Sequence, residues 1–131
     1  MIIKQDLDDY RKLNVLLDEI DEEIADAYNT YRSPAWRNDG AQKQISADSP
    51  TERALNRIRH LEEYRCRTNQ KVLEIETFVD CIDKYLVQAV IRDHYMRGLT
   101  WEATCRHLLK HASKAQAIKL VDDYFEERQI G

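Results

Sequence analysis

Residues that are mostly apolar recur at alternating steps of three and four over much of the chain, and this spacing constrains the fold more than any other feature. In the first stretch the series is Ile3, Tyr10, Leu13, Leu17, Ile20, Ile24, Ala27 and Tyr31, with Asp6 as the single polar interruption. In the second it is Thr51, Ala54, Ile58, Leu61, Arg65, Thr68, Val72, Ile75, Val79 and Ile82. Such spacing puts each series on one stripe of an α-helix, as in a coiled coil. The sequence therefore predicts two long helices.

Residues that break helices are scarce, with 3 Gly and 2 Pro among 131 residues. A β-sandwich or barrel needs frequent turn residues, and a phosphate-binding α/β fold needs Gly-rich loops. We therefore predict an all-α protein. No apolar run reaches the roughly 20 residues of a membrane span, and residues 1–6 lack the pattern of a signal peptide, so we expect a soluble, cytoplasmic protein with no membrane partner.

Helix-breaking and polar residues separate the two predicted long helices. Arg32-Ser33-Pro34 should end the first, because proline disfavours helix in the residue before it. The polar stretch over about 32–48 is typical of a flexible linker. Ser49-Pro50-Thr51-Glu52 then has the residues of a helix start: a capping hydroxyl, proline at the first position and a glutamate three residues after the cap.

The second helix, of about 33 residues, would be about 50 Å long and must find partners along its length. Residues 1–31 hold nine acidic residues against three basic ones, and the second helix offers Arg53, Arg57, Arg59, Arg65, Arg67 and Lys71. We predict that residues 1–83 form a long antiparallel two-helix coiled hairpin. It would serve either as an oligomerisation stalk or as an intramolecular scaffold.

The three cysteines, Cys66, Cys81 and Cys105, are odd in number and contain no Cys-x-x-Cys pair. A disulfide framework or a zinc site would need other spacings. We expect them to stay reduced and partly buried.

From Lys84 onward the helical segments are shorter. The first should close at Gly98, a second should start at the capping residue Thr100, and a third should start at Ser113, which forms a capping box with Gln116. Three short helices with tight turns are typical of a helix-turn-helix unit, here expected over residues 84–131.

The segment Tyr95-Met96-Arg97-Gly98-Leu99-Thr100-Trp101-Glu102 resembles the signature that opens the helix-turn-helix of sigma-70 region-4-like proteins. The whole layout resembles that of small phage and prophage proteins of Gram-positive bacteria, of the late-gene transcription regulator type. The resemblance implies that Ser113 begins a recognition helix, whose early residues enter the major groove of DNA. That role would fall on Ser113, Lys114, Ala115, Gln116 and Lys119.

Three departures from this pattern stand out. Cys105 replaces a small alanine, and the turn Leu109-Lys110-His111-Ala112 is about two residues longer than usual. The end of the last helix is acidic where the family is basic, with Asp122, Asp123, Glu126 and Glu127. DNA phosphates would repel these four carboxylates.

Residues 92–121 hold six basic residues and two acidic ones, the one basic surplus of any size in the chain. Lys114 and Gln116 are predicted to reach base edges, glutamine being suited to adenine. Phosphate contacts are predicted for Arg97, Arg106, Lys110 and Lys119.

Two further groupings bear on chemistry. His107 and His111 are four residues apart, but zinc needs three or four ligands, so no metal site is predicted. Asp93-His94 could be an acid/base pair, yet no nucleophile accompanies it, and we interpret it as an exposed dipeptide of a helix. We predict no enzyme, no catalytic residue and no cofactor.

The sequence thus predicts a DNA-binding transcription regulator that forms a homo-oligomer, binds double-stranded DNA and contacts RNA polymerase. Two alternatives belong to other classes. One is a structural or assembly protein, such as a small-terminase-like packaging subunit. The other is a protein-interaction module without DNA binding, whose acidic first helix engages a basic partner.

Overall fold

The computed structural model describes residues 1–31, 50–110 and 112–130, and within them all regular structure is helical, with no strand. The α-helices are α1 (Lys4–Tyr31), α3 (Pro50–Asp80), α4 (Tyr85–Ile91), α5 (Trp101–Thr104) and α6 (Lys114–Ile130). Two wider π-helical turns, η1 (Arg92–Met96) and η2 (Cys105–Leu109), continue α4 and α5. The prediction of an all-α fold is confirmed.

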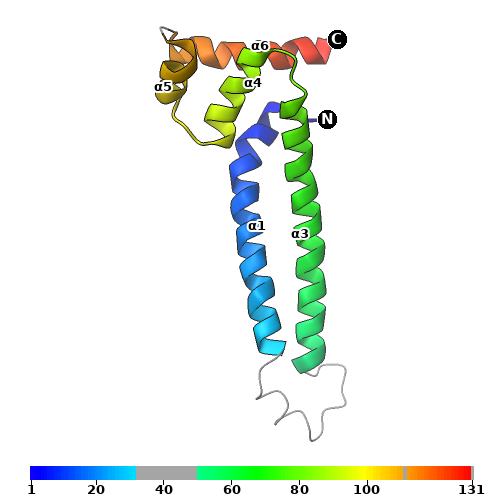
Figure 1. Ribbon diagram of the computed structural model, residues 1–131. Coiled ribbons are helices and arrows are strands. Elements are labelled where there is room, and N and C mark those ends of the chain that lie inside the picture. Colours follow the sequence, from blue (N-terminus) through cyan, green and yellow to red (C-terminus); the bar gives the residue numbers. More distant parts are fainter. Residues whose placement is uncertain (32–49, 111, 131) are drawn as a thin grey trace, which may run out of the picture. The chain divides into compact units, whose positions relative to one another are not determined.

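The two long helices lie side by side and run in opposite directions (Figure 1). Among the described residues α1 extends to Tyr31 and α3 starts from Pro50. The helical hairpin is therefore confirmed. The predicted linker over 32–48 and the predicted cap Ser49 lie outside the described residues.

Contacts between residues group the chain into two compact units. Residues Val15–Gln70 form one, and residues Met1–Asn14 together with Lys71–Gly131 form the other. The first three turns of α1 and the last turns of α3 thus belong with the C-terminal helices. We call these the hairpin unit and the C-terminal unit.

The hairpin unit is held by a narrow seam of small and branched side chains, of which Ile20, Ala27, Ala54, Ile58 and Leu61 are buried. Ion pairs flank this seam. A guanidinium nitrogen of Arg57 lies 3.5 Å from Glu23, and Nε of Arg65 donates to Asp21 at 2.6 Å. The predicted pairing of the acidic first helix with arginines of the second is thus present, although these exposed contacts stabilise by only about 0–1 kcal/mol each.

The C-terminal unit has a larger core that draws on every helix in it. Its buried apolar residues are Leu7, Tyr10, Val72, Ile75, Val79, Ile82, Val87, Val90, Ile91, Tyr95, Cys105, Ala117, Val121, Tyr124 and Phe125. The start of α1 is tied in by polar contacts as well. Tyr10 donates to Glu76 at 2.6 Å, and Lys71 lies 3.3 Å from Asp6. Burial and, after it, the bond to Glu76 raise the pKa of the Tyr10 hydroxyl.

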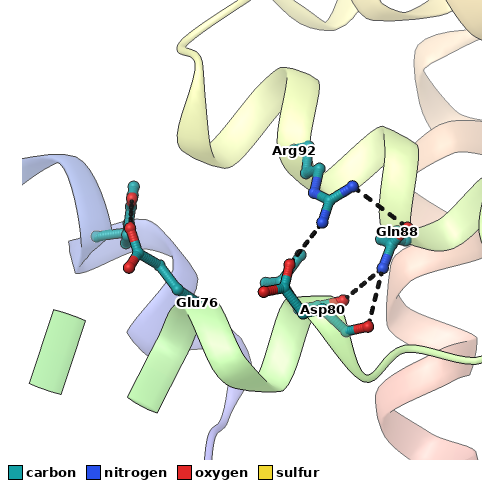
Figure 2. Close-up of polar contacts among 6 residues, drawn as sticks. Glu76, Asp80, Gln88 and Arg92 are labelled. Carbon is teal, nitrogen blue, oxygen red and sulfur yellow. Dashed lines mark hydrogen bonds and ion pairs between the residues drawn. The ribbon is translucent and has the colours of Figure 1, made fainter. Parts of the chain in front are cut away.

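The end of α3 is capped by side chains from α4 and η1 (Figure 2). The amide of Gln88 donates to the carbonyl oxygens of Val79 and Asp80 at 2.9 and 3.3 Å. Arg92 donates to the carboxylate of Asp80 at 2.6 Å. A carboxylate at the carboxyl end of a helix opposes the helix dipole, so the guanidinium offsets an unfavourable charge while the amide satisfies free carbonyls.

The last three helices follow the predicted caps. Gly98 has a positive φ of 81°, and Thr100 accepts from the backbone N–H of Ala103 at 3.1 Å. Helix α6 packs against both α4 and α5. It is 17 residues long, and so is not the short helix expected from the sequence.

None of the described helices combines the length and the apolar character needed to cross a lipid bilayer.

Candidate nucleic-acid interface

The amino-terminal end of α6 is exposed and locally ordered. Ser113 and Gln116 form the predicted capping box: the Ser113 N–H donates to Oε1 of Gln116 at 2.8 Å, and the Gln116 N–H donates to the Ser113 hydroxyl at 3.3 Å. Residues 113–116 and Lys119 are exposed, whereas Ala117 and Val121 point into the core. The cap therefore fixes where α6 starts while its first turn stays accessible.

Four of the predicted DNA-contacting cationic residues are exposed and, among the described residues, have no acidic partner. Within the described parts of the chain, Arg106, Lys110, Lys114 and Lys119 form no ion pair. Lys110 also has a positive φ of 51°, and the Ala112 N–H donates to the Leu109 carbonyl at 3.1 Å across the turn. These cations are free to meet an anionic partner.

Arg97 differs from the other predicted phosphate ligands. Its guanidinium donates to Oδ1 of Asp93 at 2.8 Å, while 63% of the side chain stays exposed. The aspartate holds the guanidinium in one place and neutralises part of its charge.

Gln116 is partly committed to the cap. Its Oε1 accepts from the Ser113 N–H, so one acceptor position of the amide is used. A bidentate contact to adenine needs both the oxygen and the NH₂ group. The NH₂ group remains available to donate.

Two of the four acidic residues near the end of α6 are paired within the molecule. Asp122 forms an ion pair with Lys4 of α1, and Glu127 accepts from Lys84 at 2.8 Å. The hydrogen bond to Glu127 raises the pKa of Lys84. Asp123 and Glu126 are exposed, and within the described residues neither forms an ion pair. Two of the four carboxylates that were predicted to repel DNA thus have a basic partner within the molecule.

Asp93 is a functional candidate whose position the sequence did not reveal. We interpreted Asp93-His94 as exposed, and this was wrong for the aspartate, which is 1% exposed. Its Oδ2 lies 2.6 Å from Nδ1 of His107, and its backbone oxygen accepts from the Leu99 N–H at 2.9 Å. A buried carboxylate needs such partners to offset the loss of hydration. Asp93 therefore joins η1 to η2.

One sequence signal could have indicated that Asp93 faces inward. Val87, Val90 and Asp93 follow one another at steps of three, and both valines are buried. Residues three apart share a helix face, so the aspartate continues an apolar stripe.

His94, the neighbour, also has a structural partner. Its ring stacks on that of Trp101 at 3.7 Å between centroids, and its Nδ1 lies 2.8 Å from the Leu99 carbonyl. Tyr95 meets Trp101 edge to face at 5.9 Å. The signature residues Tyr95 and Trp101 are thus packing partners that shape the turn around Gly98.

Among the described residues, the thiols and histidines form no group that could hold a metal ion. All three cysteines are free; Cys105 is buried, while Cys66 and Cys81 are exposed, so the expectation of partial burial was wrong for these two. In the described residues no three His, Cys, Asp or Glu side chains lie together in a way that could hold a metal ion. His111, the second member of the histidine pair, lies outside the described residues.

A hollow of about 510 Å³ lies in the hairpin unit and is lined by Glu23, Asp26, Ala27, Pro50, Arg53, Ala54 and Arg57. One of its guanidinium groups, that of Arg57, is already paired with Glu23. Its lining contains no hydroxyl, thiol or histidine. Its acid–base groups are the carboxylates of Glu23 and Asp26, and that of Glu23 is held in the ion pair with Arg57.

Comparisons of the chain with protein-family models, with curated proteins and with solved structures found no match.

Proposed function

We propose that the chain is a DNA-binding transcription regulator of the phage type, in which the first turns of α6 enter the major groove of duplex DNA. The observation that carries this proposal is the exposed, capped start of α6. Lys114 and Lys119 extend from it, and within the described chain they have no acidic partner. A rigid helix end with free cations is what groove binding by a helix-turn-helix requires.

The supporting cations lie on the segments before α6. Arg106 and Lys110 are exposed at the end of the second motif helix, and Arg97 is held by Asp93. Side chains of this kind contact phosphates and so position a helix in the groove without reading sequence.

The acidic end of α6 weakens this interaction less than its composition suggests. Lys4 and Lys84 compensate Asp122 and Glu127, which leaves Asp123 and Glu126 as the main source of repulsion. We expect affinity to be modest and to fall steeply with salt, because binding rests on phosphate contacts.

An electrophoretic shift assay with random duplex DNA at about 50 mM salt tests the proposal. The wild-type chain should shift the duplex, and the double variant Lys114→Ala/Lys119→Ala should bind about tenfold or more weakly. Its slope of log affinity against log salt should become shallower by about one for each phosphate that the variant no longer neutralises.

The matched control is Lys12→Ala/Arg59→Ala, which removes the same charge from exposed positions on α1 and α3. It should bind almost as the wild type does. If both double variants bind equally weakly, the effect comes from net charge and not from the start of α6. If the wild type does not shift the duplex at all, the protein-interaction module is favoured.

A further inference from the structure

One side of the hairpin unit carries two large apolar residues at the same level. Glu23 of α1 and Arg57 of α3 lie 3.5 Å apart, and the small residues Ala27 and Ala54 line the same hollow, which together give the register of the two helices to within about one residue. Leu16 is seven residues before Glu23, and Tyr64 is seven after Arg57. Seven residues make about two helical turns, and the helices are antiparallel, so Leu16 and Tyr64 lie level with each other on the side of that ion pair. We call this side the Leu16–Tyr64 face.

Both residues are exposed, and the seam beneath them is incompletely covered. Leu16 is 43% exposed and Tyr64 56% exposed. Leu17 and Ile24, which follow the coiled-coil spacing, are only half-buried. Arg67 lies over the Tyr64 ring, 5.0 Å from its centroid, which keeps the ring in place on the surface. Two helices alone cannot shield a coiled-coil seam from water, so this face has apolar area left to bury.

Acidic and basic residues lie along opposite long edges of the Leu16–Tyr64 face. On α1, Glu19 and Glu23 lie three and seven residues after Leu16. On α3, Arg57, His60 and Arg67 lie within seven residues of Tyr64. One edge of the face is therefore acidic and the other basic.

We propose that the Leu16–Tyr64 face is a dimer interface occupied by a second copy of this chain. A two-fold axis parallel to the helices would place α1 of one copy against α3 of the other. The acidic edge then meets the basic edge in both halves of the interface, and Leu16 meets Tyr64 of the second copy. A two-fold axis across the helices would instead put acid against acid and base against base, which is unfavourable.

The resulting assembly is a four-helix bundle in which every neighbouring pair of helices is antiparallel. Such bundles bury their seam with the same knobs-into-holes packing as coiled coils. This inference deepens the oligomerisation that we expect of the regulator. It uses only residues of the hairpin unit and does not depend on DNA binding.

The test is the mass of the full chain in solution without DNA, by sedimentation equilibrium over a concentration series up to about 100 µM. The wild type should reach twice the chain mass of 15.5 kDa. Tyr64→Glu should weaken the dimer by about tenfold or more, because it puts a charge at the centre of the interface. Circular dichroism should show unchanged helix content, since Tyr64 is largely exposed within one chain.

A matched control and a rescue make the result specific. Leu55→Glu alters a residue of α3 that is 45% exposed but nine positions from Tyr64, on the other side of the seam, and it should leave the mass unchanged. Leu16→Lys should also weaken the dimer, and Leu16→Lys/Tyr64→Glu should restore association, because each lysine then meets a glutamate of the other copy.

Three results would overturn the proposal. The wild type could stay at the mass of one chain throughout the series. Leu55→Glu could dissociate the dimer while Tyr64→Glu does not, which would move the interface to the opposite side. The double variant could associate no better than Tyr64→Glu alone, which would exclude this two-fold pairing. None of these depends on whether the chain shifts DNA.

Discussion

Oδ2 of Asp93 lies 2.6 Å from Nδ1 of His107, and this contact joins η1 to η2 across 14 residues. The aspartate is buried, whereas 61% of the histidine side chain is exposed. Arg97 binds the other carboxylate oxygen at 2.8 Å. One inward-facing acid thus holds two outward-facing basic side chains within the basic segment 92–121.

Replacing Asp93 by asparagine should lower the free energy of unfolding by about 1–3 kcal/mol, because a charge-assisted hydrogen bond inside the protein is removed. Urea unfolding followed by circular dichroism measures this. Glu102→Gln removes an exposed acid nine residues away and should change stability by less than about 0.5 kcal/mol. Equal effects of the two variants would contradict a structural role for the buried carboxylate.

The raised pKa of the Tyr95 hydroxyl predicts that the protein loses stability at alkaline pH. Burial, and after it the charges of Asp8 and Asp122, raise the pKa of its hydroxyl to about 12, above the usual value of 10.0. Folding therefore favours the protonated hydroxyl of Tyr95. The resulting contribution to the free energy of unfolding is complete below pH 10 and is lost as the pH rises to about 12. It amounts to at most about 3 kcal/mol.

Tyrosinate absorbance during an alkaline titration should show Tyr95 ionising after most of the seven tyrosines. Tyr95→Phe should remove this late phase and should lose less stability than the wild type between pH 10 and 12. A phase that persists in the variant would assign it to another tyrosine, such as Tyr10, whose pKa is also raised.

Thr104 and Thr100 should respond to the same substitution in opposite directions. Thr104 is fully buried, and among the described residues its hydroxyl oxygen has no hydrogen-bond partner. Thr104→Val should therefore stabilise by about 1 kcal/mol, since valine has nearly the same shape without the polar atom.

Thr100→Val, in contrast, removes the hydroxyl that accepts from the Ala103 N–H and should destabilise by about 1 kcal/mol. Thermal unfolding of the two variants side by side gives the comparison. A destabilised Thr104→Val would show that its hydroxyl is satisfied in solution.

Gly98 should tolerate no larger residue without cost. Its φ of 81° is in the left-handed region, so Gly98→Ala should lower the free energy of unfolding by about 1–2 kcal/mol. A β-carbon there would also lie 2.6 Å from Cζ of Arg11. The side chain of Arg11 is flexible at that end and can move aside.

Repeating Gly98→Ala in an Arg11→Ala background separates the two causes by urea unfolding. Most of the destabilisation should persist, because it comes from the backbone. Recovery of wild-type-like stability in that background would instead assign the cost to the arginine.

Local signals in the sequence were sufficient to predict the helices and most of their ends. Three-four spacing, Pro50, Gly98, Thr100 and the Ser113–Gln116 box act within one or two turns, so their effects do not depend on distant parts of the chain. The match of acidic and basic residues also correctly indicated ion pairs between the long helices.

Which polar residues are committed to partners depends instead on how the helices pack. Asp93 faces His107, Asp122 faces Lys4 and Glu127 faces Lys84, in each case a contact between residues far apart in sequence. Periodicity gives the face of a helix, but burial of that face depends on which other helix covers it. The charges that remain free at the start of α6 therefore follow from the three-dimensional arrangement of the helices, because composition does not show which acids neutralise which bases.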